Sequence, residues 1–253
     1  NYKDMFDVGF INNSNIALDG GGEDNAFRLS YTYYKEDGVQ PKNDFMRHAF
    51  SFKGNQDFLN DAIQVGVSVN YAQSESANPP TNTMQTAWFH DGFPRQYDVS
   101  KWRDNYKDVD GGVPYPTNTN RYMYTRKSLR WFEIYEEDRI RTENSLLLAA
   151  DVQFNILENL KGVVKGNINQ FNFDTETKVA ATSQDRLSNA QYGLSRGQKM
   201  LTSFSAELMY NKQFDPGIDF DVLVGTESWS TETASNNAST SQGFKVRDFY
   251  SIS

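Results

Sequence analysis

The chain has 253 residues, contains no cysteine and carries a formal net charge of −8 at pH 7. The absence of thiols excludes disulfide scaffolds, thiolate zinc sites and cysteine nucleophiles, and the acidic balance argues against a nucleic-acid partner. Aromatic residues make up 14% of the chain and recur at regular spacing, unlike in a disordered sequence. The longest apolar run, Leu146–Ala150, is far below the roughly 20 residues of a membrane-spanning helix.

Four runs of alternating side chains open the chain. In Ala26–Lys35 aromatic and aliphatic residues fill every second position, which predicts a strand with one apolar face and one polar face. The same alternation predicts strands over Asn15–Asp19, Phe45–Asp57 and Ala62–Ser74. Tight turns are expected at residues 20–25 and 58–61, and a longer connection at residues 37–44.

The alternation stops over residues 77–143. A loop of this length is rare in a compact domain and is usually functional. The insert is rich in proline and aromatic residues, which does not fit a disordered linker. We expect short helical turns within it at Thr83–His90 and Val99–Tyr106.

Strands resume at Asn144. We predict strands over residues 144–156, 160–178, 198–214 and 218–231, and the start of a ninth strand over 244–252. In the second of these the apolar phase changes between Ile168 and Phe171, which predicts a bulge near Asn169. Because the chain starts without methionine and ends as if within a strand, we interpret it as a fragment.

Short and long connections alternate along the predicted strands. The tight turns lie at 20–25, 58–61, 157–159 and 215–217, and the longer connections at 37–44, 77–143, 179–197 and 232–243. In an antiparallel meander, every second connection lies at the same end. The fold class predicted is therefore all-β, an antiparallel transmembrane β-barrel with short periplasmic turns and long extracellular loops. A soluble barrel or sandwich that buries the apolar face remains the alternative.

Several motifs near the start resemble a known family. The run Phe6–Gly21 (FDVGFINNSNIALDGG) resembles the first barrel strands of SusC-like TonB-dependent transporters, although Asp19 stands where the family usually has serine. Phe27–Tyr31, Asp37–Pro41 and Phe45–Arg47 resemble the segment that follows in that family. The resemblance covers roughly residues 5 to 75, and the remainder offers no specific motif.

The resemblance implies a 22-stranded barrel, of which this chain holds about nine strands, in the outer membrane of a Gram-negative bacterium of the Bacteroidota. It also implies a receptor for nutrient uptake that imports oligosaccharides or peptides, works with a SusD-like surface lipoprotein lid and contacts outer-membrane lipid. The TonB complex would energise it through an N-terminal region absent from this sequence. The plug, the TonB box and the C-terminal strands are also absent from it.

Two groups of residues are candidate contact sites. Aromatic planes stack on sugars and anchor interfaces, so the insert is the candidate for ligand or lid contact, although its rings can equally form a core of the loop itself. The insert candidates are Trp88, Trp102, Tyr115, Tyr122 and Trp131. The polar strand positions expected to face the lumen are Arg28, Arg47, Lys53, Asp151, Asp219 and Asp221.

Catalytic and metal sites are not indicated. Asp104, Asp108 and Asp110 offer oxygen ligands for Ca²⁺ but miss the EF-hand spacing, so we interpret them as a solvated acidic loop. His48 and His90 lack metal-ligand spacing. We therefore expect no enzyme, no cofactor and no metal. The rival hypothesis is a soluble, secreted all-β carbohydrate-binding or hydrolytic protein.

Overall fold

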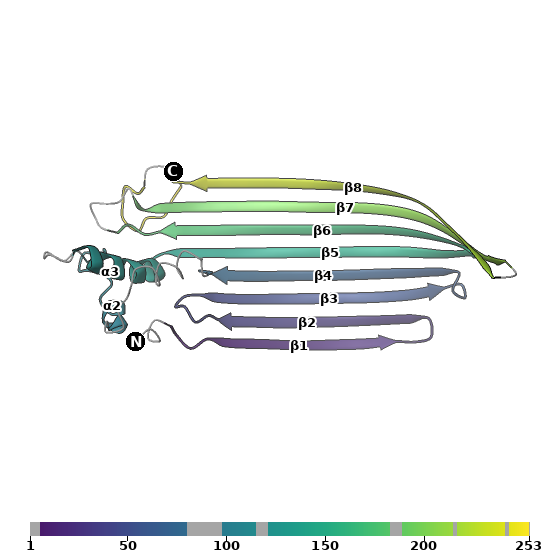
Figure 1. Ribbon diagram of the computed structural model, residues 1–253, viewed down its shortest axis with the longest axis horizontal. Coiled ribbons are helices and arrows are strands. Elements are labelled where there is room, and N and C mark those ends of the chain that lie inside the picture. Colours follow the sequence, from purple (N-terminus) through teal and green to yellow (C-terminus); the bar gives the residue numbers. More distant parts are fainter. Residues whose placement is uncertain are drawn as a thin grey trace.

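Eight antiparallel strands form one sheet in strict chain order (Figure 1). The structure is a computed structural model that describes residues 6–79, 98–114, 121–182, 189–214, 217–240 and 243–252. The strands are β1 Phe10–Gly21, β2 Asn25–Asp37, β3 Asp44–Phe58, β4 Ile63–Ala77, β5 Asp138–Leu157, β6 Leu160–Val179, β7 Gln191–Phe214 and β8 Ile218–Ser239. The prediction of an all-β antiparallel fold is confirmed. The sheet does not close on itself.

The strands are long for a soluble protein. They run from 12 residues in β1 to 24 residues in β7, whereas strands of globular proteins usually have 3–10 residues. At about 3.4 Å per residue, β7 extends over roughly 80 Å. Several strands exceed their predicted limits, because the hydrogen-bonded ladder continues through polar residues where the apolar alternation ends. β5 thus begins at Asp138 instead of Asn144, and β8 continues to Ser239 instead of Thr231.

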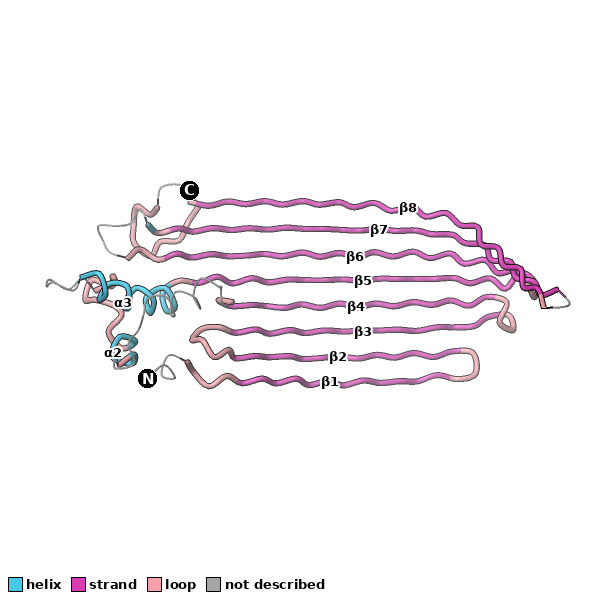
Figure 2. The backbone as a smooth tube through the Cα atoms, in the orientation of Figure 1, coloured by secondary structure: helices cyan, strands magenta, loops and turns pink. Residues whose placement is uncertain are grey.

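Connections of two kinds lie at opposite ends of the sheet (Figure 2). The short connections after β1, β3, β5 and β7 lie at one end, and the longer connections after β2, β4 and β6 lie at the other. The alternation predicted from the sequence is therefore confirmed. In the turn after β3, Leu59, Asn60 and Asp61 all have positive φ, between 53° and 65°, a conformation that residues other than glycine seldom adopt in succession.

In the part of the insert that the structure describes, two helices lie at the end of the sheet with the longer connections, which we call the loop end (Figure 1). α2 covers Val99–Arg103, within the helical turn predicted there, and α3 covers Arg121–Glu136, which the sequence analysis did not predict. The other predicted turn, Thr83–His90, lies outside the described residues. None of the helices that the structure describes is long and apolar enough to span a membrane.

The predicted bulge near Asn169 is wrong. Pairing of β5 with β6 is regular from Asp138↔Lys178 to Asn155↔Lys161, and the register shifts only between Asn155 and Leu157. The change of apolar phase has a different cause. Val164 and Ile168 lie on one face of β6, whereas Phe171 and Phe173 lie on the other, nearer the loop end.

The predicted ninth strand is also wrong, so the described residues hold eight strands instead of about nine. Residues 243–252 form turns and bends, and Asp248 has a φ of 56°, which an extended strand excludes. Phe244 packs with Ala181 and Ala190 in a small core. The Arg247 guanidinium donates to the carbonyls of Asp110, Gly111 and Ala181. These contacts hold the segment against the neighbouring loops.

Candidate functional site

The register assigns every strand residue to one of two faces. Residues directly opposite each other on paired strands point to the same side of a sheet. On one face a row of apolar side chains crosses six strands without interruption, and we call the surface to which it belongs the apolar band. This row consists of Leu18, Leu29, Phe52, Val69, Leu148 and Ile168.

The apolar band crosses the strands obliquely. On β1 the band consists of Ile16 and Leu18, so its centre is position 17. Following the register from strand to strand, position 17 corresponds to Leu201 of β7. On β7 the band lies between Phe204 and Tyr210 and is centred on position 207, six residues beyond Leu201. The band thus shifts by about one residue per strand. With about 3.4 Å per residue and 4.8 Å between strands, this shift corresponds to about 35°.

The side chains of the apolar band are exposed or only partly buried. Ile16 keeps 71% of its surface accessible, Leu208 45% and Val224 64%. Within the part of the chain that the structure describes, the strongly buried apolar residues lie at the loop end, apart from Val163. The sheet therefore has an exposed apolar surface of the kind that marks a protein interface or a membrane contact.

The opposite surface, which we call the polar face, carries all six charged residues predicted to face the lumen. Arg28 lies directly opposite Lys53, and Asp151 is in the same alternating phase on β5, as the register through β4 requires. Arg47, Asp219 and Asp221 share that phase on their own strands. The cations gather on β2 and β3 and the predicted acids on β5 and β8.

Some of these charges are paired and others are not. Arg28 forms an ion pair of 2.9 Å with Asp19, and Lys165 lies 3.1 Å from Glu207. The first pair is largely solvent-exposed and the second is partly exposed, so each contributes little to stability. Among the described residues, Arg47 and Lys53 have no ion-pair partner. They are free to contact a ligand or another protein segment at this surface.

The loop end contains a second structural unit, the loop cluster, formed by α2, α3 and residues 106–113 and 180–181. Val113, Phe132 and Ala180 form its core, against which Tyr106 and Leu129 pack. Trp131 is fully buried and stacks on Tyr135, with 5.9 Å between ring centroids. The insert therefore has a core of its own.

This core answers part of the prediction for the insert aromatics. Trp131 has no exposed surface and Trp102 keeps only 9%, so neither ring is available to a ligand in this arrangement. Trp88 and Tyr115 lie outside the described residues. Tyr122 is in the first turn of α3, where only the backbone is described. The role of the set as a ligand or lid contact stays a prediction.

Polar contacts join the loop cluster to the segment before β1 and to the connection between β2 and β3. Lys42, in the connection between β2 and β3, lies 2.6 Å from Asp138 and donates to the carbonyl of Tyr135. Arg103 of α2 donates to both carboxylate oxygens of Asp7, at 3.0 and 3.3 Å. Its guanidinium also lies 5.5 Å from the centre of the Trp131 ring. These contacts join segments that are about 95 residues apart in sequence.

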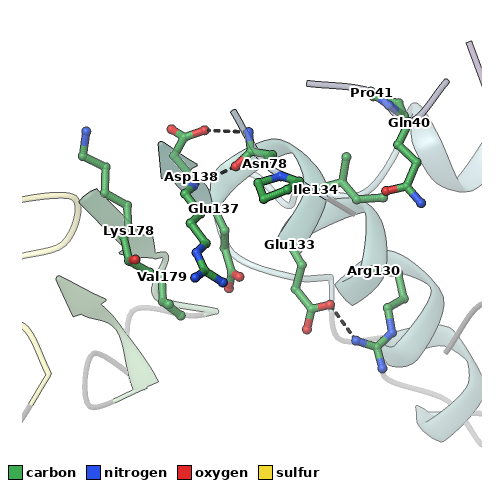
Figure 3. Close-up of a pocket in the computed structure, with 13 residues that line it drawn as sticks. Gln40, Pro41, Asn78, Arg130, Glu133, Ile134, Glu137, Asp138, Lys178 and Val179 are labelled. Atoms are coloured by element: carbon green, nitrogen blue, oxygen red, sulfur yellow. Dashed lines mark hydrogen bonds and ion pairs between the residues drawn. The ribbon is translucent and has the colours of Figure 1, made fainter. Parts of the chain in front are cut away.

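A pocket of about 290 Å³ lies between α3 and the loop ends of β5 and β6 (Figure 3). Figure 3 shows Arg130 paired with Glu133, at 2.7 Å, and Asn78 bonded to Asp138. This pocket is not predictable from the sequence, because its lining combines residues 40–41, 78–79 and 177–179 with six residues between positions 130 and 139. Only the long-range fold brings these four stretches together.

The pKa of Glu137, which lines this pocket, is raised. Burial, reinforced by the neighbouring Glu133 carboxylate, raises the pKa of Glu137 to about 7, against partial opposition from Arg130. A carboxyl group with a raised pKa favours the folded arrangement while it is protonated. The stabilisation is therefore complete below about pH 4.5 and is lost as the pH rises toward 7.

We expect the loop cluster to loosen between pH 5 and pH 8. The free energy that holds the loop cluster in its folded arrangement should fall by up to about 3 kcal/mol, which is the equivalent of the shift in the pKa of Glu137. Hydrogen exchange of the α3 amides, corrected for the intrinsic effect of pH, measures this loss. Glu137→Gln should remove the pH dependence. A variant that retains it would show that another group is responsible.

Two of the metal candidates, Asp108 and His48, take part in other contacts. Asp108 accepts a hydrogen bond from the backbone N–H of Gly112, at 2.7 Å, and so stabilises a turn. His48 lies in the phase of the apolar band and bonds the Tyr31 hydroxyl through Nδ1, at 2.7 Å. His90 lies outside the described residues. Among the described residues, no three histidine or acidic side chains are grouped to hold a metal ion.

Together these features define the class of fold. An antiparallel meander with an oblique apolar band, an opposite polar face and long connections at one end fits part of an outer-membrane β-barrel. No protein-family model matches the chain, and no curated protein matches it significantly. Solved structures do match it.

These structures are of the RagAB peptide importer. Its "open-open" state matches with a TM-score of 0.72 and 16% identity, over 99% of this chain and 27% of that chain. The "closed-closed" state matches with a TM-score of 0.69 and 16% identity, over 95% and 26%. A third structure, of the RagAB peptide transporter, matches with a TM-score of 0.68 and 14% identity, over 96% of this chain and 26% of that chain. The chain thus spans about a quarter of the chains it matches.

Proposed function

We propose that this chain forms part of the barrel wall of an outer-membrane transporter of the SusC-like, TonB-dependent kind. In this proposal the apolar band meets lipid, the polar face lines the lumen, and the connections at residues 38–43, 78–137 and 180–190 are extracellular. The wall itself catalyses nothing. It holds the path along which an oligosaccharide or a peptide enters the periplasm.

The oblique exposed band is the observation that carries this proposal. Strands of membrane barrels tilt by 35–45° from the membrane normal. If the band is level in the membrane, its slope of about 35° across the strands is the strand tilt. A soluble barrel or sandwich would cover the apolar side chains with protein, and the exposed fractions of Ile16 and Leu208 argue against that alternative.

The partners follow from the same proposal. The loop cluster lies at the end where an importer receives its substrate, which fits contact with a SusD-like lipoprotein at the mouth. The similar RagAB structures are of an importer of peptides, and this supports transport as the general activity. Energy from a TonB complex would enter through a part of the protein that is not in this chain.

Labelling of two neighbouring residues tests the orientation of the sheet. Because the chain has no cysteine, Val67→Cys and Ser68→Cys each introduce a single thiol into it, the first on the apolar band and the second on the polar face. Nitroxide labels in the intact gene product, reconstituted in bilayers, should respond differently. The label at position 67 should collide mainly with oxygen dissolved in lipid, and the label at 68 mainly with a water-soluble nickel chelate. Equal access of nickel to both positions would contradict the proposal.

A further inference from the structure

A neutral hollow lies on the polar face near the loop ends of β6, β7 and β8. It has a volume of about 320 Å³, and Gly193 lies within its lining. Around Gly193 two register rows cross three strands, Thr177–Gly193–Ser239 and Thr175–Ser195–Asn237. We call this site the Gly193 hollow. Because it lies about ten residues from the apolar band of β7, it is at the loop end of the wall.

Two glycines of β7 shape the site in different ways. At Gly197 an added Cβ would overlap the Phe173 ring, so the ring lies over this glycine and fills the space above it. At Gly193 an added Cβ would have no neighbouring atom closer than 3.9 Å. The absence of a side chain at Gly193 therefore leaves open space within the hollow.

The lining of the Gly193 hollow carries no charge, and its side chains in the phase of Gly193 are polar. Leu194 and Ala238, which also contribute to the lining, are in the opposite phase of β7 and β8. The Ser195 hydroxyl donates to Asn237 Oδ1, at 2.5 Å, which leaves the Asn237 amide N–H groups available. The side chains of Thr177, Gln191 and Ser239 have no hydrogen-bond partner among the described residues. A hydroxyl group both donates and accepts, and so does a primary amide. The hollow thus presents several free donors and acceptors on three adjacent strands.

An aromatic ring borders this polar lining. Phe173 occupies the next register row on the same face, beside Gly197. The Arg141 guanidinium lies 4.2 Å from the centre of the ring, and Glu143 pairs with Arg141 at 2.5 Å. The positive charge is thereby balanced within the wall. Phe171 continues the aromatic surface, with 6.2 Å between the two ring centroids.

We propose that the Gly193 hollow is a binding subsite for one ring of a neutral saccharide. Hydroxyl groups of a sugar match side chains that both donate and accept, and the apolar C–H face of the same ring matches an aromatic surface. The charged termini and side chains of a peptide would find no counter-charge in the lining. The inference rests on the proposed function, since it assumes that the polar face lines the path of the substrate, and it favours the saccharide over the peptide.

Binding to a printed array of neutral oligosaccharides and polysaccharides tests the proposal, with a tryptic digest of casein as the peptide comparison. The intact gene product should bind at least one neutral saccharide. Gly193→Val fills the hollow with a side chain that strands accept and should weaken this binding about tenfold or more. Thr177→Val removes one hydroxyl group at nearly constant volume and should weaken it by about threefold.

Gly166→Val is the matched control. Gly166 is also a strand glycine with open space, since no atom lies within 4 Å of an added Cβ, but it is on the face of the apolar band. Saccharide binding should change less than about twofold in this variant. Failure of every neutral saccharide to bind, or wild-type affinity in Gly193→Val, would overturn the inference. The labels at positions 67 and 68 report separately on the transporter proposal, so the two failures are distinguishable.

Discussion

Replacing Leu148 with arginine is expected to lower the free energy of unfolding in a bilayer by about 2–4 kcal/mol. Leu148 lies in the apolar band between Val69 of β4 and Ile168 of β6. If the band meets lipid, a guanidinium at this position must either enter the hydrocarbon or distort the bilayer around it. Denaturant unfolding of the intact gene product in phospholipid vesicles measures the effect.

Ala149→Arg is the control, because the next residue along β5 points to the polar face, between Ser68 and Asn167. Here the long side chain extends over uncharged polar neighbours, and the free energy of unfolding should change by no more than about 0.5 kcal/mol. A similar loss in both variants would mean that both faces are buried in protein. A small effect in both variants would contradict the proposal that the apolar band contacts lipid.

The existence and the sidedness of the strands were predictable from the sequence. β4 was expected at Ala62–Ser74 and is found at Ile63–Ala77, because a period of two is a local property that each strand carries by itself. The same period places Arg28 and Lys53 on one face, and the register confirms that they lie opposite each other. Sidedness therefore needs no knowledge of the neighbouring strands.

The ends of the strands were not predictable in the same way. Apolar alternation marks only the part of a strand that lies in the apolar band. β5 continues through Asp138–Glu143 and β8 through Glu232–Ser239, where polar residues prevail on both faces and Ile140 is the one large apolar side chain. In these stretches the backbone hydrogen bonds to the neighbouring strand define the structure, and they leave little trace in the side chains.

The loop end required information that is non-local. α3 has no acidic residue in its first turn and no basic residue in its last turn, so it lacks the usual charge signals of a helix. The sequence indicates the Gly193 hollow only indirectly, through the neighbouring aromatic residues of β6. The change of phase at Phe171 and Phe173 was interpreted as a bulge, whereas it marks the point where aromatic residues move to the polar face.

Trp131→Ala is expected to destabilise the loop cluster by about 3–5 kcal/mol, the range for truncation of a buried aromatic residue. The indole ring is fully buried, stacks on Tyr135 and lies beneath the Arg103 guanidinium. Its removal leaves a cavity where α2 and α3 meet. Hydrogen exchange should become faster in α3, while the amides of β3 and β4 remain protected, since the ladder does not depend on this core.

Two further variants separate packing from ligand contact. Trp131→Phe retains most of the buried surface and should restore much of the protection from hydrogen exchange in α3. Val109→Ala is the control at a fully exposed position of the same insert, and it should change stability by less than about 0.5 kcal/mol. If Trp131 acts through packing, any loss of substrate or lid binding in Trp131→Ala should recover in Trp131→Phe together with the α3 protection. Loss of binding in a variant whose α3 stays protected would instead assign a direct contact to the indole. That outcome would require the loop cluster to open when the substrate or the lid binds, since the closed cluster leaves no surface of the ring accessible.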